Sequence, residues 1–256
     1  MKRAHIGALT GLSILVGLAA ATAGYAALRL AESARAARRG HAFDKLAEAE
    51  GSRLLIIGDS RAEGAGASAP ENSLPGLLSR ANPSLTVVNK AQHGARFEDF
   101  LSQLDGDESF DAVLVVGGAN DVLRLTREAA LREDVQRVAQ RARVRAALVI
   151  FMSPGNVGNA RIFLPPWNWW LSYRSRRLEA IVSEVARANG ALHVSLFQER
   201  GDDPFARHPR RMSARDGLHP SDAGYELWQR ELETQVQLSA KLRKIGRNAM
   251  RREAVF

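Results

Sequence analysis

From residue 53 onward the chain alternates short apolar runs with longer segments of mixed polarity. The first run, 54–57, lies between Arg53 and Gly58 and is typical of a short strand buried on both faces. Similar runs occur at 86–89, 112–116, 146–152 and 192–196, and helices are expected at 74–80, 96–104, 127–143, 175–189 and 221–244. Strands that alternate with helices at this spacing predict an α/β fold with a mainly parallel, five-stranded sheet between two helical layers.

A long uncharged stretch precedes this region. Residues 4–28, between Arg3 and Arg29, carry no formal charge over 25 positions. As a helix they would extend about 37 Å, enough to cross a bilayer with some tilt. A cleaved signal peptide is the alternative, because Lys2 and Arg3 form a basic start and residues 21–23 read Ala-Thr-Ala. The length of the apolar stretch favours an uncleaved N-terminal transmembrane helix.

Charged residues around this stretch bear on its orientation and on the domain boundaries. More basic residues follow the span than precede it, so the positive-inside rule favours a cytoplasmic domain, with export after signal cleavage as the alternative. We expect a membrane anchor at 1–28, a basic tether at 29–50, a globular domain at 51–236 and a basic C-terminal tail at 237–256.

Composition narrows the classes of function. The 256 residues are 45% hydrophobic and include no cysteine, which allows a real core and excludes disulfides and a cysteine nucleophile. The net charge of +8 lies at the ends: residues 51–236 hold 23 basic and 23 acidic side chains. A neutral body with basic ends favours contact with anionic lipid over a nucleic-acid groove, and solvated tails are the plain alternative.

Ser60 comes three residues after the end of the first apolar run, in Gly58-Asp59-Ser60. This position predicts a hydroxyl at the carboxyl edge of the sheet, where α/β proteins build their sites. A serine in this position could instead cap a helix N-terminus. As a nucleophile it would need a base, a group that orients the base and donors for an oxyanion. No Gly-x-Ser-x-Gly is present, so the nucleophile elbow of α/β-hydrolases is absent.

Asp216 and His219 supply a base and its partner within one turn. In Asp216-Gly217-Leu218-His219-Pro220 the carboxylate precedes the imidazole by three residues. That spacing lets the carboxylate accept the Nδ1 proton and leaves Nε2 free for a nucleophile. A surface histidine before a capped helix is the alternative.

Two further loops offer donors for an oxyanion. Gly94 follows the second predicted strand and could present its backbone N–H, although a glycine that eases a tight turn would look the same. Asn120 follows the third strand, in Gly118-Ala119-Asn120-Asp121, and its amide is a neutral donor, although asparagine is also a common loop residue.

Four sequence blocks, taken in chain order, resemble those of the SGNH (GDSL) hydrolase superfamily over about residues 51–236. They are Gly58-Asp59-Ser60, Gly94, Gly118-x-Asn120-Asp121 and Asp216-x-x-His219-Pro220. The resemblance implies a flavodoxin-like three-layer α/β/α fold and hydrolysis of acyl esters or thioesters without metal or cofactor. By the same resemblance, Ser60 is the nucleophile, His219 the base and Asp216 its partner, and Ser60 N–H, Gly94 N–H and Asn120 form the oxyanion hole. The bulky Gln92-His93 before Gly94, and Arg61 after the serine, depart from the usual pattern and bear on substrate shape.

Three of the four tryptophans cluster at 167–170. Trp167, Trp169 and Trp170 follow the fourth strand, so we consider three roles for them: a wall for an acyl chain, an aromatic edge at the bilayer interface, or a loop packed on the body.

Together, the apolar N-terminal stretch and the four blocks favour a membrane-tethered esterase, lipase or lysophospholipase-like enzyme acting on an acyl ester or lipid-like substrate. A carbohydrate O-acetyl esterase or acyltransferase, and a catalytically silent scaffold, are the alternatives.

Overall fold

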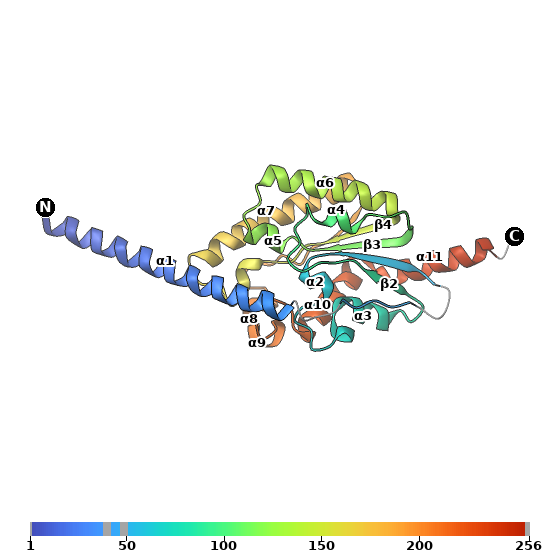
Figure 1. Cartoon of the computed structure of the whole chain (residues 1–256), viewed down its shortest axis with the longest axis horizontal. Helices are drawn as coiled ribbons and strands as arrows, with labels where there is room; N and C mark the ends of the chain where they lie inside the picture. Colours follow the sequence, from blue (N-terminus) through green and yellow to red (C-terminus); the bar gives the residue numbers. More distant parts are fainter. Residues whose placement is uncertain (1, 38–41, 47–50, 254–256) are drawn as a thin grey trace.

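The computed structural model describes residues 2–37, 42–46 and 51–253 and contains the predicted sheet (Figure 1). Five parallel strands lie in the order β2-β1-β3-β4-β5. This is the flavodoxin-like order, in which the chain changes direction across the sheet at β1. The strands are β1 (Arg53–Gly58), β2 (Thr86–Asn89), β3 (Phe110–Val116), β4 (Ala146–Met152) and β5 (Leu192–Val194).

Helices cover both faces of this sheet, as the alternation predicted (Figure 1). One layer holds α4 (Phe100–Gln103), α5 (Ala119–Leu123), α6 (Glu128–Arg145) and α7 (Trp167–Ala188). The other holds α2 (Ser60–Glu63), α3 (Leu74–Ala81), α10 (Asp222–Val236) and α11 (Leu238–Glu253). The remaining short elements are η1 (Pro70–Asn72), η2 (Val157–Asn159), α8 (Pro204–Arg207) and α9 (Pro209–Met212).

Successive side chains of each strand enter different cores. In β1, Leu55 and Ile57 pack into the cluster under α4, α6 and α7, whereas Leu54 and Ile56 pack under α3 and α10. Since side chains alternate along a strand, an apolar run is required wherever both faces of a parallel sheet are covered. This confirms the three-layer α/β/α fold.

Three predicted helices differ from the observed ones. The helix expected at 96–104 is reduced to α4, because the Asp99 carboxylate accepts a 2.8 Å hydrogen bond from Arg96 N and closes a turn there. The helix expected at 175–189 begins earlier, at Trp167, so the tryptophan cluster is its first turn rather than a loop. The helix expected at 221–244 is broken at Gln237, whose φ of 53° is left-handed.

The N-terminal helix also crosses the boundary that we predicted at residue 28. Helix α1 (Lys2–Ala37) is continuous, so residues 29–37, the start of the predicted tether, extend the helix of the predicted anchor. Its Ser13–Arg35 stretch is long and apolar enough to cross a membrane or to act as a signal sequence, with a mean hydropathy of 1.6. Residues 13–18 are exposed all round, and the N-terminal end of α1 projects from the body (Figure 1).

The predicted C-terminal tail begins inside the body. Leu238 and Leu242 of α11 are buried in the core under α3 and α10, and the Leu242 carbonyl accepts a 2.6 Å hydrogen bond from Ser52 Oγ. The globular unit therefore extends beyond residue 236.

We predict that Leu242→Ala lowers the free energy of unfolding by about 2 to 4 kcal/mol, because it opens a cavity around a side chain that is only 2% exposed. Chemical denaturation monitored by circular dichroism measures the change. The exposed neighbour provides the control: Arg243→Ala should cost less than about 0.5 kcal/mol. Equal, small effects of the two substitutions would show that α11 is not part of the core.

Candidate active site

The Ser60 hydroxyl is positioned by a cap that the preceding residue provides. β1 ends at Gly58, and the Asp59 side chain caps α2 by accepting a 2.9 Å hydrogen bond from Arg61 N. Ser60 is therefore the first residue of the helix and not its cap, which removes the capping alternative. Its hydroxyl lies at the carboxyl edge of the sheet, next to the point where the strand order reverses.

His219 and Asp216 meet this hydroxyl in a linear chain of hydrogen bonds. Ser60 Oγ lies 2.8 Å from His219 Nε2, and His219 Nδ1 lies 2.6 Å from Asp216 Oδ2. The imidazole is only 3% exposed, so His219 is not a surface histidine. The turn at 216–219 holds the pair together, because Asp216 Oδ1 accepts hydrogen bonds from the backbone N–H of Leu218 (2.9 Å) and of His219 (3.1 Å).

Asp216 is held ionised by these donors. Burial by itself would raise the pKa of this carboxyl, but hydrogen bonds from His219, Leu218 and Ser33 outweigh burial and hold the pKa below its ordinary value. A permanent carboxylate at this position fixes the proton on Nδ1 and leaves Nε2 as the basic nitrogen.

Contacts between chain-distant loops bring Gly94 and Asn120 to the same region. Gln92 N donates to the Gly58 carbonyl (3.1 Å), and the rings of His93 and His219 have centroids 6.5 Å apart. Asn120 Nδ2 donates to the Ala95 carbonyl (3.0 Å), next to Gly94. An amide carries two N–H donors, so this bond leaves the second one available.

Asp121 also connects the loop that contains Gly94 with the segment that contains Asn120. From the sequence alone, no role is assigned to Asp121. Its buried carboxylate accepts a 3.1 Å hydrogen bond from Phe97 N, three residues after Gly94. Burial raises the pKa of Asp121 to about 6 despite this bond. The place of Asp121 directly after Asn120 in the sequence was the signal that could have indicated a role for it.

Ser33 of α1 is the second group that the sequence did not indicate. Its hydroxyl donates to Asp216 Oδ2 (2.7 Å) and lies 3.1 Å from His219 Nδ1. Nearby, Arg29 Nη2 donates to the Arg215 carbonyl (3.3 Å). Nothing in the alternating Ala, Arg and Glu of residues 29–37 distinguishes Ser33, because only the docking of α1 brings it to the triad.

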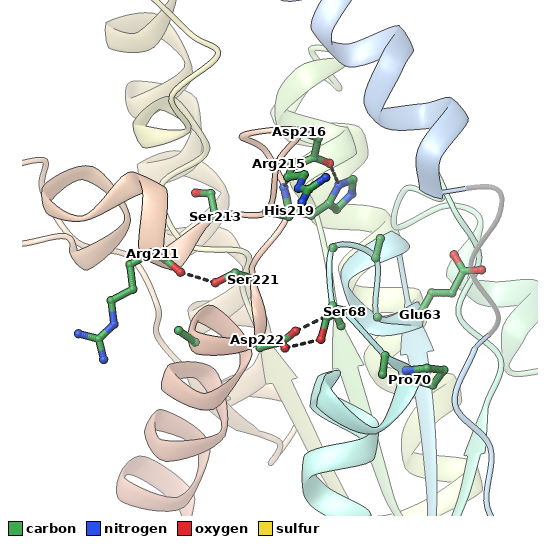
Figure 2. Close-up of a pocket in the computed structure, with 17 residues that line it drawn as sticks. Glu63, Ser68, Pro70, Arg211, Ser213, Arg215, Asp216, His219, Ser221 and Asp222 are labelled. Atoms are coloured by element: carbon green, nitrogen blue, oxygen red, sulfur yellow. Dashed lines mark hydrogen bonds and ion pairs between the residues drawn. The ribbon is translucent and has the colours of Figure 1, made fainter.

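A cavity of about 930 Å³ adjoins this cluster. Figure 2 shows Asp216, His219 and Arg215 at one end of it and the bonded pair Ser68 and Asp222 farther along. The whole lining comes from residues 63–70, 211, 213–216, 219 and 221–223. None of the three clustered tryptophans lines this cavity.

A second serine–histidine pair lies at the carboxyl end of β4. Ser153 Oγ is 2.9 Å from His193 Nε2, while Glu179 approaches the same nitrogen at 3.5 Å. Because both groups face one nitrogen, this pair lacks the carboxylate on Nδ1 that a base needs for orientation. Among the described residues, no group of His, Asp and Glu side chains is arranged to hold a metal ion.

Comparison with known proteins agrees with the fold and the order of the blocks. The profile of the GDSL-like Lipase/Acylhydrolase family matches residues 56–227. A GDSL-like esterase of Mycobacterium tuberculosis is 27% identical over 187 residues, which are 68% of this chain and 58% of that relative's length. This chain therefore matches less than two thirds of that relative.

Solved structures share the same architecture. A lipase/acylhydrolase from Enterococcus faecalis has a TM-score of 0.59 at 24% identity, with 75% of this chain and 97% of that chain covered. A mutant acetyl-xylooligosaccharide esterase from Geobacillus has a TM-score of 0.55 at 19% identity, with 74% and 96% covered. The family profile spans all four blocks, from the strand before Ser60 to the helix after His219, and the chain belongs to the GDSL-like lipase/acylhydrolase family.

Proposed function

We propose that the protein is a membrane-tethered serine esterase that cleaves acyl esters or thioesters through an acyl-serine intermediate. The observation that carries the proposal is the chain of short contacts from Ser60 through His219 to Asp216. An alcohol is a weak nucleophile, and a buried imidazole oriented by a carboxylate is the arrangement that activates it.

In the first half of the reaction, His219 Nε2 takes the Ser60 proton as Oγ bonds to the acyl carbon. The resulting imidazolium is stabilised by ionised Asp216, and it gives the proton to the leaving alcohol or thiol as the bond to the acyl carbon breaks. In the second half, water attacks the acyl-serine and gives a proton to His219, which returns it to Ser60 Oγ as the acid leaves.

The developing oxyanion needs donors that are already in place. We assign this role to the backbone N–H of Ser60, the backbone N–H of Gly94 and the free N–H of Asn120 Nδ2. The contacts from Gln92 to Gly58 and from Asn120 to Ala95 support the assignment, since they hold the three donor segments against one another. Donors fixed in a site that excludes water stabilise charge without reorganisation.

Two observations bear on the class of substrate: the apolar helix α1 next to the triad, and a solved structure with the same fold. An apolar helix that leads directly to the triad favours a lipid-like ester over a soluble one. The fold is shared with an acetyl-xylooligosaccharide esterase, so an O-acetyl ester of a carbohydrate is the second candidate. Turnover across esters of increasing acyl length separates the two, because the first should favour long chains and the second acetate. The tryptophan wall for an acyl chain stays a prediction.

We expect a fluorophosphonate probe to label wild-type protein covalently and to leave Ser60→Ala unlabelled, because only an activated hydroxyl attacks phosphorus. Gel fluorescence and peptide mass spectrometry measure the labelling and its position. Ser153→Ala is a matched control, since Ser153 is also buried and bonded to a histidine. It should label like wild type. Labelling of Ser60→Ala, or its loss in Ser153→Ala alone, would identify a different nucleophile.

Asn120→Ala should lower kcat for a short aryl ester by about 100- to 1,000-fold, on the order of 3 kcal/mol, with a smaller effect on KM. The reason is that the amide would contact the oxyanion more strongly than the ground-state carbonyl. Steady-state kinetics on protein checked for folding by circular dichroism measures the loss. Turnover close to that of wild type would exclude Asn120 from the oxyanion hole.

A further inference from the structure

The first turns of α7 and the loop before it carry an exposed aromatic surface. Large side chains that are a third or more exposed occur there within ten residues, at Leu164, Trp167, Trp169, Trp170 and Tyr173. We name these five residues the α7 aromatic patch. Trp169 is 66% exposed, and the Trp170 and Tyr173 rings stack at 5.7 Å. Clustered exposed aromatics mark an interaction surface, whereas single exposed apolar residues are ordinary.

The patch is continuous with the projecting part of α1. Trp167 Nε1 donates a 3.0 Å hydrogen bond to the Ala19 carbonyl. N-terminal to this contact, residues 13–18 are exposed, including Ile14, Leu15, Val16 and Leu18. From this contact toward the C-terminus, residues that are at least partly covered recur every three or four positions, at 19, 22, 23, 26, 29, 30, 33 and 34. That spacing is one face of a helix, so α1 packs against the body from about Ala19 to Ser33.

We propose that the α7 aromatic patch rests in the lipid interface of a bilayer, with the membrane boundary at the level of Ala19 on α1. This inference rests on the proposed membrane tether. Tryptophan and tyrosine favour the boundary between headgroups and hydrocarbon, where an apolar ring and a polar N–H or O–H are both accommodated. The occupant is a lipid surface rather than a second copy, because the patch joins residues 13–18 of α1, which are exposed on every side and belong to a stretch apolar enough to cross a membrane.

This placement changes the extent of the membrane segment. Residues 19–28, which the sequence assigned to the span, are held against the protein. Residues 4–18 extend about 22 Å as a helix, most of the way through a hydrocarbon core of about 30 Å. The body then lies directly on the membrane surface instead of at the end of a flexible tether.

Tryptophan fluorescence in brominated vesicles tests the placement, since bromine quenches only indoles that reach it. The full chain is reconstituted in phosphatidylcholine vesicles brominated either near the glycerol or near the chain ends. One variant carries Trp167→Phe and Trp170→Phe and keeps Trp169 and Trp228. A reference variant carries Trp167→Phe, Trp169→Phe and Trp170→Phe and keeps only Trp228, which is 3% exposed. A third adds Val144→Trp to the reference, because Val144 is 80% exposed on α6.

We expect quenching in the Trp169 variant, stronger for bromine near the glycerol, and none in the reference or in the Val144→Trp variant. Equal quenching in the Val144→Trp variant, or none at Trp169 in protein that floats with vesicles, would overturn the placement. Failure to float would refute the tether itself. An emission shift that depends on protein concentration and not on lipid would assign the patch to contact between copies.

A second inference rests on a different observation, the contact of α1 with the proposed triad. Ser33 is 1% exposed, and its hydroxyl reaches both partners of the short bond between Asp216 and His219. We infer that Ser33 is a positioning residue that fixes the carboxylate against the imidazole, and this rests on the proposed triad. Docking of α1 and orientation of the base are then coupled.

Ser33→Ala should lower kcat for a short soluble ester about tenfold with KM unchanged, because one hydrogen bond to a charged group is lost. The resonance of the His219 Nδ1 proton in the NMR spectrum should also move, which tests the geometry without any turnover. Ser52→Ala is the control, since Ser52 is buried and its hydroxyl donates a 2.6 Å hydrogen bond to the Leu242 carbonyl, outside the proposed triad.

Ser52→Ala should change neither kcat nor that proton resonance. Folded Ser33→Ala protein with the kcat and the proton resonance of wild type would overturn the positioning role. A wild-type protein without esterase activity would refute the proposed function, and a resonance that still moves in Ser33→Ala would leave the structural coupling standing.

Discussion

The arrangement of the site depends on how closely the ends of β1 and β3 approach each other. A Cβ at Gly58 would lie 1.8 Å from the Val116 carbonyl oxygen, so residue 58 must be a glycine. This approach turns the chain sharply after β1, and Asp59 caps the helix that begins there. β3 is followed by Gly117 and Gly118, where a Cβ would lie 2.6 Å from the Phe100 ring and 2.7 Å from the Leu178 side chain, and Asn120 follows in α5. Close packing at one strand junction thus positions both the proposed nucleophile and a proposed oxyanion donor.

Buried charge is concentrated around this junction, and each group has its own compensation. Asp216 is held ionised by several hydrogen bonds, whereas Asp121 has one backbone donor and a pKa raised to about 6. Arg61, the unusual residue after the serine, is buried with its guanidinium 3.5 Å from Asp59. A buried charge without a partner is costly, so this pairing explains how the site accommodates an arginine in that position.

Helix α1 connects the proposed site to the proposed membrane face. Its covered face runs from Ala19, which contacts Trp167, to Ser33, which contacts Asp216 and His219. Over 14 residues this is about 21 Å of rigid helix. A helix fixed at both contacts would hold the triad at a constant height above the lipid, and a flexible tether would not.

The sequence by itself determined the strands, the order of the four blocks and the family, because a sheet covered on both faces demands continuous apolar runs and because Asp216 and His219 are neighbours in one turn. Only the tertiary structure decided where α7 begins, that Gln237 breaks the last helix, and that Leu242 belongs to the core. It alone revealed Ser33 and Asp121, since their roles arise from packing between segments far apart in the chain. Periodicity reports which face of an element is buried, but it carries no information about which element covers that face.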